Sequence, residues 1–376
     1  MIKTAYMAQT EATRIAKTAI EMEAFAVSMY TYLAKKYPSL ADSFLEFAGK
    51  ESNHLIFWSN FLKKRKIEPQ IKKPSQLKTT TYQTAIHLLG RGLTLRLMER
   101  SEASSIELYA GILSDTEVDE PERRDIQIIL KDELVHEEEF IKEQSKMGGF
   151  MNYIKDAILG LNDGLVEILS VTTGLAGVYG SPYAVALGSL VVGIAGALSM
   201  GISTYTSSRS QRQVHEGTLK RIASISRYVA VVIKERVKQY SLDKGYSQDV
   251  ASSIAEETTS KPGMLSDFIA EEEYGLSTES LAEPSKAAMY AGFSNLLGAL
   301  IPLAPYFFVS DITSALILSL TFATIFLSVT GFLVSLLANM PARVKVFEMV
   351  VSGLGSAAIT YVIGWGASIL MGSKVA

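Results

Sequence analysis

The pattern of apolar positions along the chain changes near residue 150. Before it, apolar residues recur every three or four positions among charged ones, which predicts amphipathic helices. After it, apolar runs reach the length of about 20 residues that a membrane-spanning helix needs. We therefore predict an all-α chain, with a four-helix bundle over residues 1–147 and a membrane domain over residues 151–376.

Four helices are predicted in the first part, over about residues 9–36, 39–66, 79–114 and 119–147. Ser39 and Asp42 are interpreted as a capping box that starts the second helix. Asp119 followed by Pro121 is typical of a helix start, and the pair Gly148-Gly149 of a helix end.

The first and third helices carry the same stripe of inward positions. Its steps are identical, so that Glu23 corresponds to Glu102 and Tyr30 to Tyr109. The second and fourth helices match each other in the same way. The first part is therefore predicted to be a tandem repeat of one helix pair.

The second and fourth helices each carry a glutamate and a histidine three residues apart: Glu51 with His54, and Glu133 with His136. Residues at this spacing share a helix face. Two such pairs on facing helices, with single glutamates from two others, form the recurring di-metal site of four-helix bundles. The alternative is that these residues are exposed on charged helices. That alternative would explain one such motif more readily than two motifs in register. Because buried carboxylates are costly unless paired or bound to a cation, we favour the metal site.

The composition limits the chemistry of such a site. The chain has no cysteine, which excludes disulfides, thiolate zinc sites and iron–sulfur clusters. Metal ligands must then be Glu, Asp, His or Met. The formal net charge of −3 offers no basic footprint for nucleic acid.

On these residues the first part resembles the ferritin-like superfamily, and rubrerythrin-type domains in particular. The resemblance implies a di-iron site for Fe²⁺, with Mn²⁺ as the alternative metal. Glu99, one turn before Glu102, resembles the additional glutamate that can let one metal switch ligands in rubrerythrins. Without cysteine the chain cannot carry the rubredoxin module that usually accompanies such domains. The implied ligands are Glu23, Glu51, His54, Glu99, Glu102, Glu133 and His136.

Five membrane spans are predicted in the second part, at about residues 155–178, 184–207, 285–308, 312–338 and 346–371. Pro302 and Pro305 should bend or break the third span. A polar insertion with helical patterning, residues 209–283, separates the second span from the third. Lys and Arg gather in this insertion and in the turn at 341–345, while the turns at 179–183 and 308–311 have none. The positive-inside rule then places the bundle and the insertion in the cytosol and the C-terminus outside.

Polar residues inside apolar spans are expensive and often functional. Asp163 and Glu167 lie four residues apart in the first span and share one face, which predicts an ion path. The alternative for Asp163 is an interfacial acid whose side chain reaches out of the hydrocarbon. Met200 in the second span would by itself be assigned to packing.

The segment Asp156-Ala-Ile-Leu-Gly-Leu-Asn-Asp163-Gly-Leu-Val-Glu167, followed by Gly196-Ala-Leu-Ser-Met200-Gly, resembles the vacuolar iron transporter (VIT/CCC1-like) family. The resemblance implies five spans, a homodimer, and export of divalent iron or manganese from the cytosol, with protons as the coupling ion. It places Asp163 and Met200 on the ion path. The glutamate pairs that bind metal in the insertion of some members are sparse here. Weaker candidates there are His215, Glu216, Glu235 and Glu273.

The two resemblances together indicate a fusion of the membrane-bound ferritin type, a multi-pass protein expected in the cell membrane. The leading hypothesis is an iron exporter whose cytosolic bundle binds the metal and delivers or senses it. The alternative is a membrane-anchored ferroxidase or peroxidase that uses the di-iron site. Five spans with polar residues inside them favour the transporter, because one span would suffice as an anchor.

Overall fold

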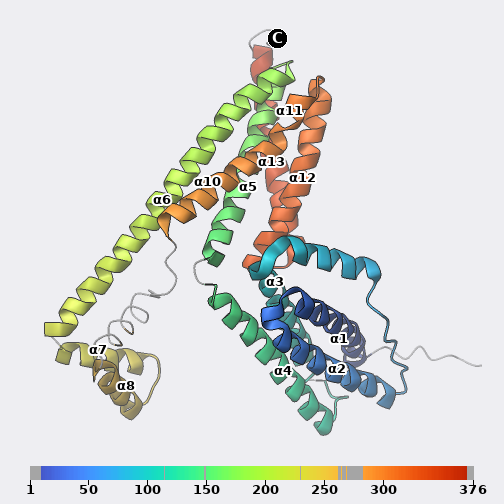
Figure 1. Ribbon diagram of the computed structural model, residues 1–376, viewed down its shortest axis with the longest axis vertical. Coiled ribbons are helices and arrows are strands. Elements are labelled where there is room, and N and C mark those ends of the chain that lie inside the picture. Colours follow the sequence, from blue (N-terminus) through green and yellow to red (C-terminus); the bar gives the residue numbers. More distant parts are fainter. Residues whose placement is uncertain are drawn as a thin grey trace, which may run out of the picture. The chain divides into compact units, whose positions relative to one another are not determined.

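The computed structural model describes residues 10–370, except 114, 148–149, 229 and most of 261–282, where residues 264 and 268 alone are described. The chain forms two compact units, Met1–Met147 and Gly148–Ala376 (Figure 1). Every element among the described residues is helical, which confirms the all-α prediction. Each unit is described by itself below.

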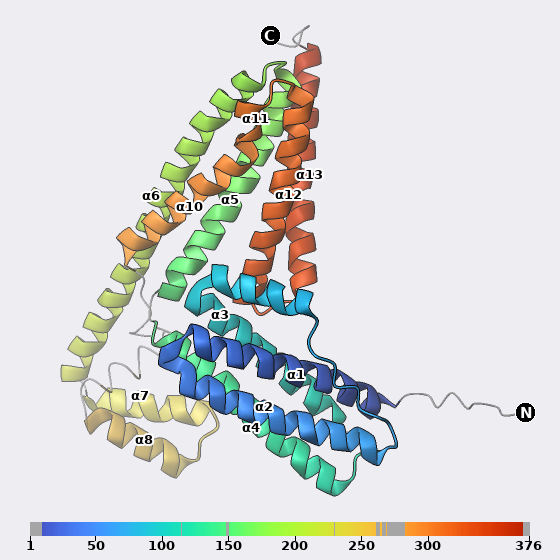
Figure 2. The same ribbon diagram turned by 45° about the vertical axis from the view of Figure 1, so that its right-hand side comes forward.

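The first unit is a bundle of four helices (Figure 2). Helix α1 packs on α2 and α3 packs on α4, as expected for two related helix pairs. A short 3-10 turn, η1, precedes α2. The bounds are α1 Glu11–Lys36, η1 Pro38–Leu40, α2 Ala41–Lys64, α3 Gln76–Ile112 and α4 Glu120–Ser145.

The helix starts are only in part those predicted. Asp119 caps α4: its side chain accepts from the backbone N–H of Glu122, whose side chain accepts in turn from the N–H of Asp119. The capping box predicted at Ser39 is wrong, because Pro38 starts the 3-10 turn η1 and α2 follows it directly. Leu40 then occupies the N-cap position of α2, and its apolar side chain cannot accept a hydrogen bond from the helix.

The predicted third helix is broken at Gly90. Its φ of 68° lies in the left-handed region, which glycine adopts at little energetic cost because it has no Cβ. The stretch after Gly90 supplies the buried positions of α3 other than Ile86, including Leu95 and Glu102.

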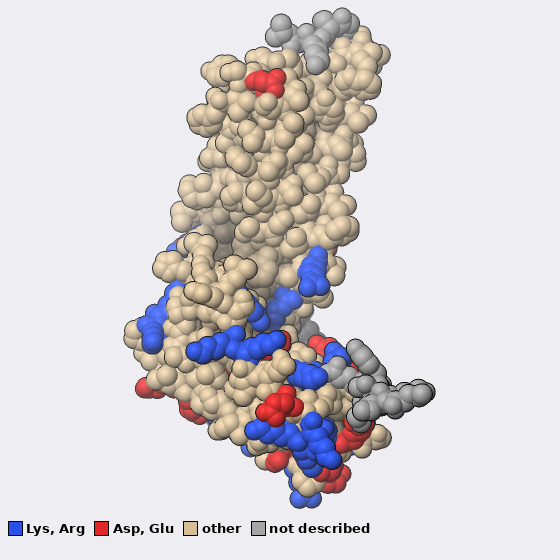
Figure 3. Space-filling model, turned by 90° about the vertical axis from the view of Figure 1, so that its right-hand side faces the viewer, with Lys and Arg blue, Asp and Glu red and all other residues tan. Residues whose placement is uncertain are grey.

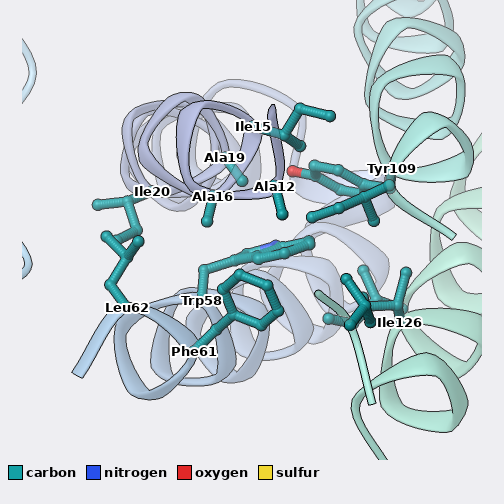
Figure 4. Close-up of a cluster of buried hydrophobic side chains, with 13 residues drawn as sticks. Ala12, Ile15, Ala16, Ala19, Ile20, Trp58, Phe61, Leu62, Tyr109 and Ile126 are labelled. Carbon is teal, nitrogen blue, oxygen red and sulfur yellow. The ribbon is translucent and has the colours of Figure 1, made fainter. Parts of the chain in front are cut away.

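The core of the bundle is built around Trp58 of α2, which is fully buried (Figure 4). Small residues of α1, Ala12 and Ala16 among them, leave room for the indole. The ring of Tyr109 lies 5.1 Å from it, centroid to centroid. Burying a large apolar side chain stabilises a fold by about 1.5–3 kcal/mol, so this cluster holds α1, α2 and α3 together.

The second unit contains the apolar helices. Four helices among the described residues are long and apolar enough to cross a membrane. On one face of the molecule their surface is almost free of charged side chains (Figure 3). The four are Phe150–Val178 (α5), Pro182–Thr218 within α6 (Pro182–Tyr228), Ile312–Leu337 (α12) and Ala342–Leu370 (α13).

The predicted third span, residues 285–308, is divided into α10 (Pro284–Leu303) and the short α11 (Pro305–Phe308). The break lies at Ala304, between the two prolines expected to cause it. Helix α10 carries Lys286 and Asn295 among its apolar residues and is not among the four. It packs on both α5 and α6, where Asn295 is fully buried, whereas Lys286 near its start is exposed and pairs with Glu283.

The insertion is helical among its described residues. Helix α6 extends far beyond the predicted end of the second span and reaches Tyr228. Two short helices, α7 (Ala230–Asp243) and α8 (Gln248–Ser260), follow and pack against each other.

Helices α5 and α10 approach so closely that their backbones touch at glycines. A Cβ at Gly160 would lie 2.3 Å from the carbonyl oxygen of Ala291, and one at Gly164 would lie 2.0 Å from that of Asn295. On the other helix, a Cβ at Gly298 would lie 2.1 Å from the carbonyl oxygen of Leu161. Small residues are the usual means of close helix packing in membranes, and here they fix the register of the two helices.

Candidate metal centre and ion path

Six of the seven predicted ligands meet in the middle of the bundle, and all six are buried. They form two overlapping groups, in each of which one ligand atom per residue lies within 4.8 Å of the others. Both groups contain Glu51 and Glu133, so these two carboxylates would be shared if each group held an ion. The groups are Glu23, Glu51, His54 and Glu133, and Glu51, Glu102, Glu133 and His136.

Both histidines direct Nδ1 to the carboxylates. His54 Nδ1 lies 3.3 Å from oxygens of Glu51 and of Glu133. His136 Nδ1 lies 3.2 Å from the other oxygen of Glu51 and 3.6 Å from Glu102. Glu51 thus faces one imidazole on either side, and each group contains one imidazole, as expected for a two-metal centre.

The two tyrosines of the repeat cross between the helix pairs. The hydroxyl of Tyr109 donates to Glu23 at 2.6 Å, and the hydroxyl of Tyr30 donates to Glu102. Each tyrosine therefore orients the glutamate that belongs to the other half of the repeat. Such outer contacts fix the direction of a ligand before the metal arrives.

Three of the buried carboxyls resist ionisation. Burial raises the pKa of Glu102 to about 7. Burial, together with the neighbouring Glu51, raises the pKa of Glu23 well above its usual range. Burial and the neighbouring Glu102 do the same for the pKa of Glu133.

Glu51 and His54 behave in the opposite way, because each is held by charged or polar partners. Burial opposes ionisation of Glu51, but the neighbouring polar groups of Glu23, His136 and His54 lower its pKa. Burial also opposes the charged form of His54, yet the carboxylates of Glu133 and Glu51, each 3.3 Å from Nδ1, raise its pKa to about 9.

These side chains fit a bound cation. Among the described residues, both oxygens of Glu51, one of Glu133 and Nδ1 of both histidines are buried without a hydrogen-bond partner. Buried polar groups in native proteins are nearly always paired, so such a set needs an explanation. Carboxylate and imidazole donors suit Fe²⁺ and Mn²⁺, and two divalent ions would supply the missing partners.

The two halves of the centre differ in their outer contacts, which the sequence analysis missed. Nε2 of His54 donates to Asp132 at 3.4 Å, and Lys50 lies 3.4 Å from the other oxygen of Asp132. By the repeat, Lys50 occupies the position that corresponds to Asp132. Nε2 of His136 has no such acceptor among the described residues, and the imidazole ring of His136 lies 4.2 Å from the ring of Phe47, centroid to centroid. Comparing the residues before each Glu-x-x-His motif would have shown the difference.

Glu99, the seventh predicted ligand, lies outside both groups. Its carboxylate accepts from Gln144 at 2.6 Å and forms an ion pair with Arg96. It lies one turn from Glu102 on α3, and its role as a ligand stays a prediction.

In the second unit, Asp163 and Glu167 lie one turn apart on α5 and meet different helices. Asp163 accepts a hydrogen bond from Asn295 of α10 at 3.2 Å. The carboxylate of Glu167 lies against Gly196 of α6, where a Cβ would be 2.6 Å from its Oε2. Met200 follows Gly196 by one turn and so shares that face of α6.

The candidates in the insertion are not brought together. His215 is buried, with no partner for Nε2 among the described residues, whereas Glu216 is exposed and pairs with Arg212 at 3.1 Å. Glu235 is exposed, and Glu273 lies outside the described residues. Within the described part of the insertion, no group of three metal-ligand side chains forms.

Comparisons with known proteins agree with this division of the chain. A model of the VIT family matches residues 154–365, and a rubrerythrin model matches residues 15–144. Protein CCC1 of Saccharomyces cerevisiae is 30% identical over 186 residues, which cover 47% of this chain and 57% of that protein. Vacuolar iron transporter 1 of Tulipa gesneriana is 27% identical over 210 residues, 54% of this chain and 83% of that protein. Vacuolar iron transporter 1 of Oryza sativa subsp. japonica is 27% identical over 210 residues, 54% of this chain and 82% of that protein.

The apolar helices and these matches identify an integral membrane protein. The matched range 154–365 begins within α5 and ends within α13, so it holds all four helices that are apolar enough to cross a membrane. The buried ligands of the bundle fall within the rubrerythrin match. The chain therefore belongs to the VIT family and carries a rubrerythrin domain ahead of its membrane domain.

Proposed function

We propose that the protein transports divalent iron, or manganese, through a path that includes Asp163, Glu167 and Met200. One observation carries the proposal: two carboxylates lie one turn apart inside a helix apolar enough to cross a bilayer. Acids in such helices are costly and mark ion paths. The relatives named vacuolar iron transporters support iron as the cargo, and carboxylate and thioether ligands suit it.

The exposure of Asp163 supports a homodimer. Its side chain is exposed on the surface of the single chain, although it lies within the apolar helix α5. A carboxylate facing hydrocarbon would be far more costly than one facing protein or water. A second copy on this side would enclose it and give a dication two negative charges.

We propose that α10 and α11 together supply a third crossing, which makes five. With five crossings, the bundle and the insertion lie on one side of the membrane and the C-terminus on the other. The basic residues of the insertion favour the cytosol for that side, and the cell membrane is the proposed location. Iron then leaves the cytosol, and a carboxylate that holds a cation in one step and a proton in the next couples the two flows in opposite directions.

The bundle, proposed as a separate domain over residues 1–147, binds the metal and either delivers it to the path or senses its concentration. Its two overlapping groups of buried ligands support a di-iron centre. Delivery and sensing predict different behaviour of Glu51→Ala. A strict relay loses all flux, whereas a gate changes the metal concentration at which flux begins.

Transport is tested with the full chain in proteoliposomes, with the bundle facing outward and a pH gradient across the membrane. We expect Fe²⁺ uptake that depends on the gradient and is lost in Asp163→Asn. Uptake unchanged in that variant would exclude the proposed path, and absence of uptake in the unaltered chain would exclude transport under these conditions.

A membrane-anchored ferroxidase or peroxidase is the second candidate, and the geometry of the bundle favours it as an added activity. Two carboxylates shared by both ligand groups, with one imidazole in each group, match the donor set of di-iron carboxylate proteins. Oxygen consumption on Fe²⁺ addition, in the absence of any uptake, would move the assignment to this enzyme.

A further inference from the structure

Asn295 is a polar side chain whose burial the proposed path does not yet explain. It lies in α10, is fully buried, and donates from Nδ2 to Oδ2 of Asp163 at 3.2 Å. Its Oδ1 has no hydrogen-bond partner among the described residues. An amide oxygen left unpaired in the interior is unfavourable, so its presence beside an acid of the proposed path calls for a physical reason.

The backbone leaves Asn295 little freedom to move away from Asp163. Its own carbonyl oxygen touches Gly164, the residue after Asp163, where a Cβ would be only 2.0 Å away. The same close approach recurs one turn earlier, between Gly160 and Ala291. The two helices therefore hold the amide opposite the carboxylate.

The orientation of the amide follows from its partner. An ionised Asp163 can only accept hydrogen bonds, so the amide must turn its NH₂ group to the carboxylate. The carbonyl Oδ1 is then directed away from that oxygen and stays free for another partner. A side chain that served only to join α5 to α10 would leave this oxygen unpaired.

We propose that Asn295 and Asp163 form one cation site, in which Oδ1 of Asn295 is a neutral oxygen ligand and its amide group positions the carboxylate. Divalent cations accept both carboxylate and amide oxygens as ligands. A neutral ligand replaces part of the hydration of the ion without adding charge, which favours release as well as binding. This inference rests on the proposed transport function for its role, but the site itself is tested independently.

The test compares Asn295→Leu, which keeps a similar volume and loses both polar atoms, with Asn295→Asp, which keeps an oxygen ligand. Ser319→Ala is the matched control. Ser319 of α12 is fully buried too and donates at 2.7 Å to the carbonyl oxygen of Pro302 in α10, the helix that carries Asn295. Its loss therefore removes a packing contact of α10 that does not involve Asp163.

Binding is measured by Mn²⁺ electron paramagnetic resonance on the full chain in detergent, in a Glu51→Gln/Glu133→Gln background that weakens the bundle sites. We expect Asn295→Leu to weaken the remaining Mn²⁺ site by about tenfold or more, a loss of about 1.4 kcal/mol. Asn295→Asp retains binding, and Ser319→Ala does not change it. In proteoliposomes, the concentration of Fe²⁺ that gives half-maximal uptake should rise in Asn295→Leu. It should change little in Asn295→Asp and Ser319→Ala.

Equal Mn²⁺ affinity in the unaltered chain and in Asn295→Leu would overturn the inference. Equal losses in Asn295→Leu and Asn295→Asp would overturn it too, because the oxygen would then not be the ligand. If the unaltered chain transported neither metal but bound Mn²⁺ in an Asn295-dependent way, the proposed function would fail and the site would stand.

Discussion

Removing metal from the bundle should make its stability fall as the pH rises. The perturbation is chelation of the metal followed by a pH series from 5 to 8. The groups responsible are Glu102, with a pKa raised to about 7 by burial, and His54, whose pKa is about 9 because the neighbouring carboxylates outweigh burial. In the unfolded chain these groups have their ordinary pKa values of 4.5 and 6.5.

Both groups act in the same direction. A group with a raised folded pKa binds its proton more tightly in the folded state, so its contribution is complete below the unfolded pKa and is lost as the pH rises through the folded one. For Glu102 that window runs from about 4.5 to 7, and for His54 from about 6.5 to 9. Glu51, with a lowered pKa, changes stability only at lower pH, outside the range of the experiment. The shift at Glu102 alone corresponds to a loss on the order of 3 kcal/mol.

The assay follows urea unfolding of the full chain in detergent by tryptophan fluorescence. The chain has two tryptophans, and Trp365→Phe leaves Trp58, which is fully buried in the bundle, as the reporter. We expect the metal-free bundle to lose stability between pH 5 and 8 and the metal-loaded one to lose much less. Glu102→Gln is the control, since it removes one titrating group and should flatten the metal-free curve.

A metal-free bundle whose stability stayed constant or rose over this range would refute the reasoning. So would a Glu102→Gln curve as steep as that of the unaltered chain, because Glu102 would then not hold its proton in the folded state.

Three further outcomes follow from single contacts. Asp132→Ala should weaken metal binding at the His54 side by about 10–100-fold, as loss of an orienting partner does, and a Co²⁺ absorption titration with unchanged affinity at both sites would contradict this. Gly196→Ala should slow transport with little loss of thermal stability, because its Cβ displaces the flexible end of Glu167; normal uptake rates would exclude a role for that contact. Gly164→Ala should destabilise the membrane domain by about 1–3 kcal/mol or more, since its Cβ meets a backbone carbonyl of α10 that cannot yield; an unchanged melting temperature in detergent would show that the helices can move apart.

The sequence predicts the bundle and the meeting of six candidate ligands well, because both depend on periodicity within single helices. The spacing of Glu51 and His54 fixes a common face, and the repeat places the same pair on α4. It does not predict the break at Gly90, since a glycine in a helical pattern gives no sign of a left-handed φ. Nor does it predict the end of α6, whose polar extension keeps helical periodicity beyond the apolar run.

The sequence does not predict contacts between helices, for a different reason. Asp132 acts on the histidine of another helix, and Asn295 on the acid of another span, so both pairings depend on register. That register is set by close approaches such as the one at Gly164, which no pattern along one helix reveals. The partners of Glu99 were equally hidden. The resemblance implies that Glu99 is a metal ligand, and in this structure its carboxylate accepts a hydrogen bond from Gln144 and forms an ion pair with Arg96.

The crossed tyrosine bonds bear on the origin of the bundle. Because Tyr30 holds the glutamate of α3 and Tyr109 that of α1, neither helix hairpin contains a complete centre. An ancestral single hairpin would have had to associate with its own copy to bind two ions. In one polypeptide the two halves are free to carry different residues at equivalent positions, as Lys50 and Asp132 do where they pair with each other. In a symmetric ancestor both positions would have held the same residue, with no opposite charge to meet.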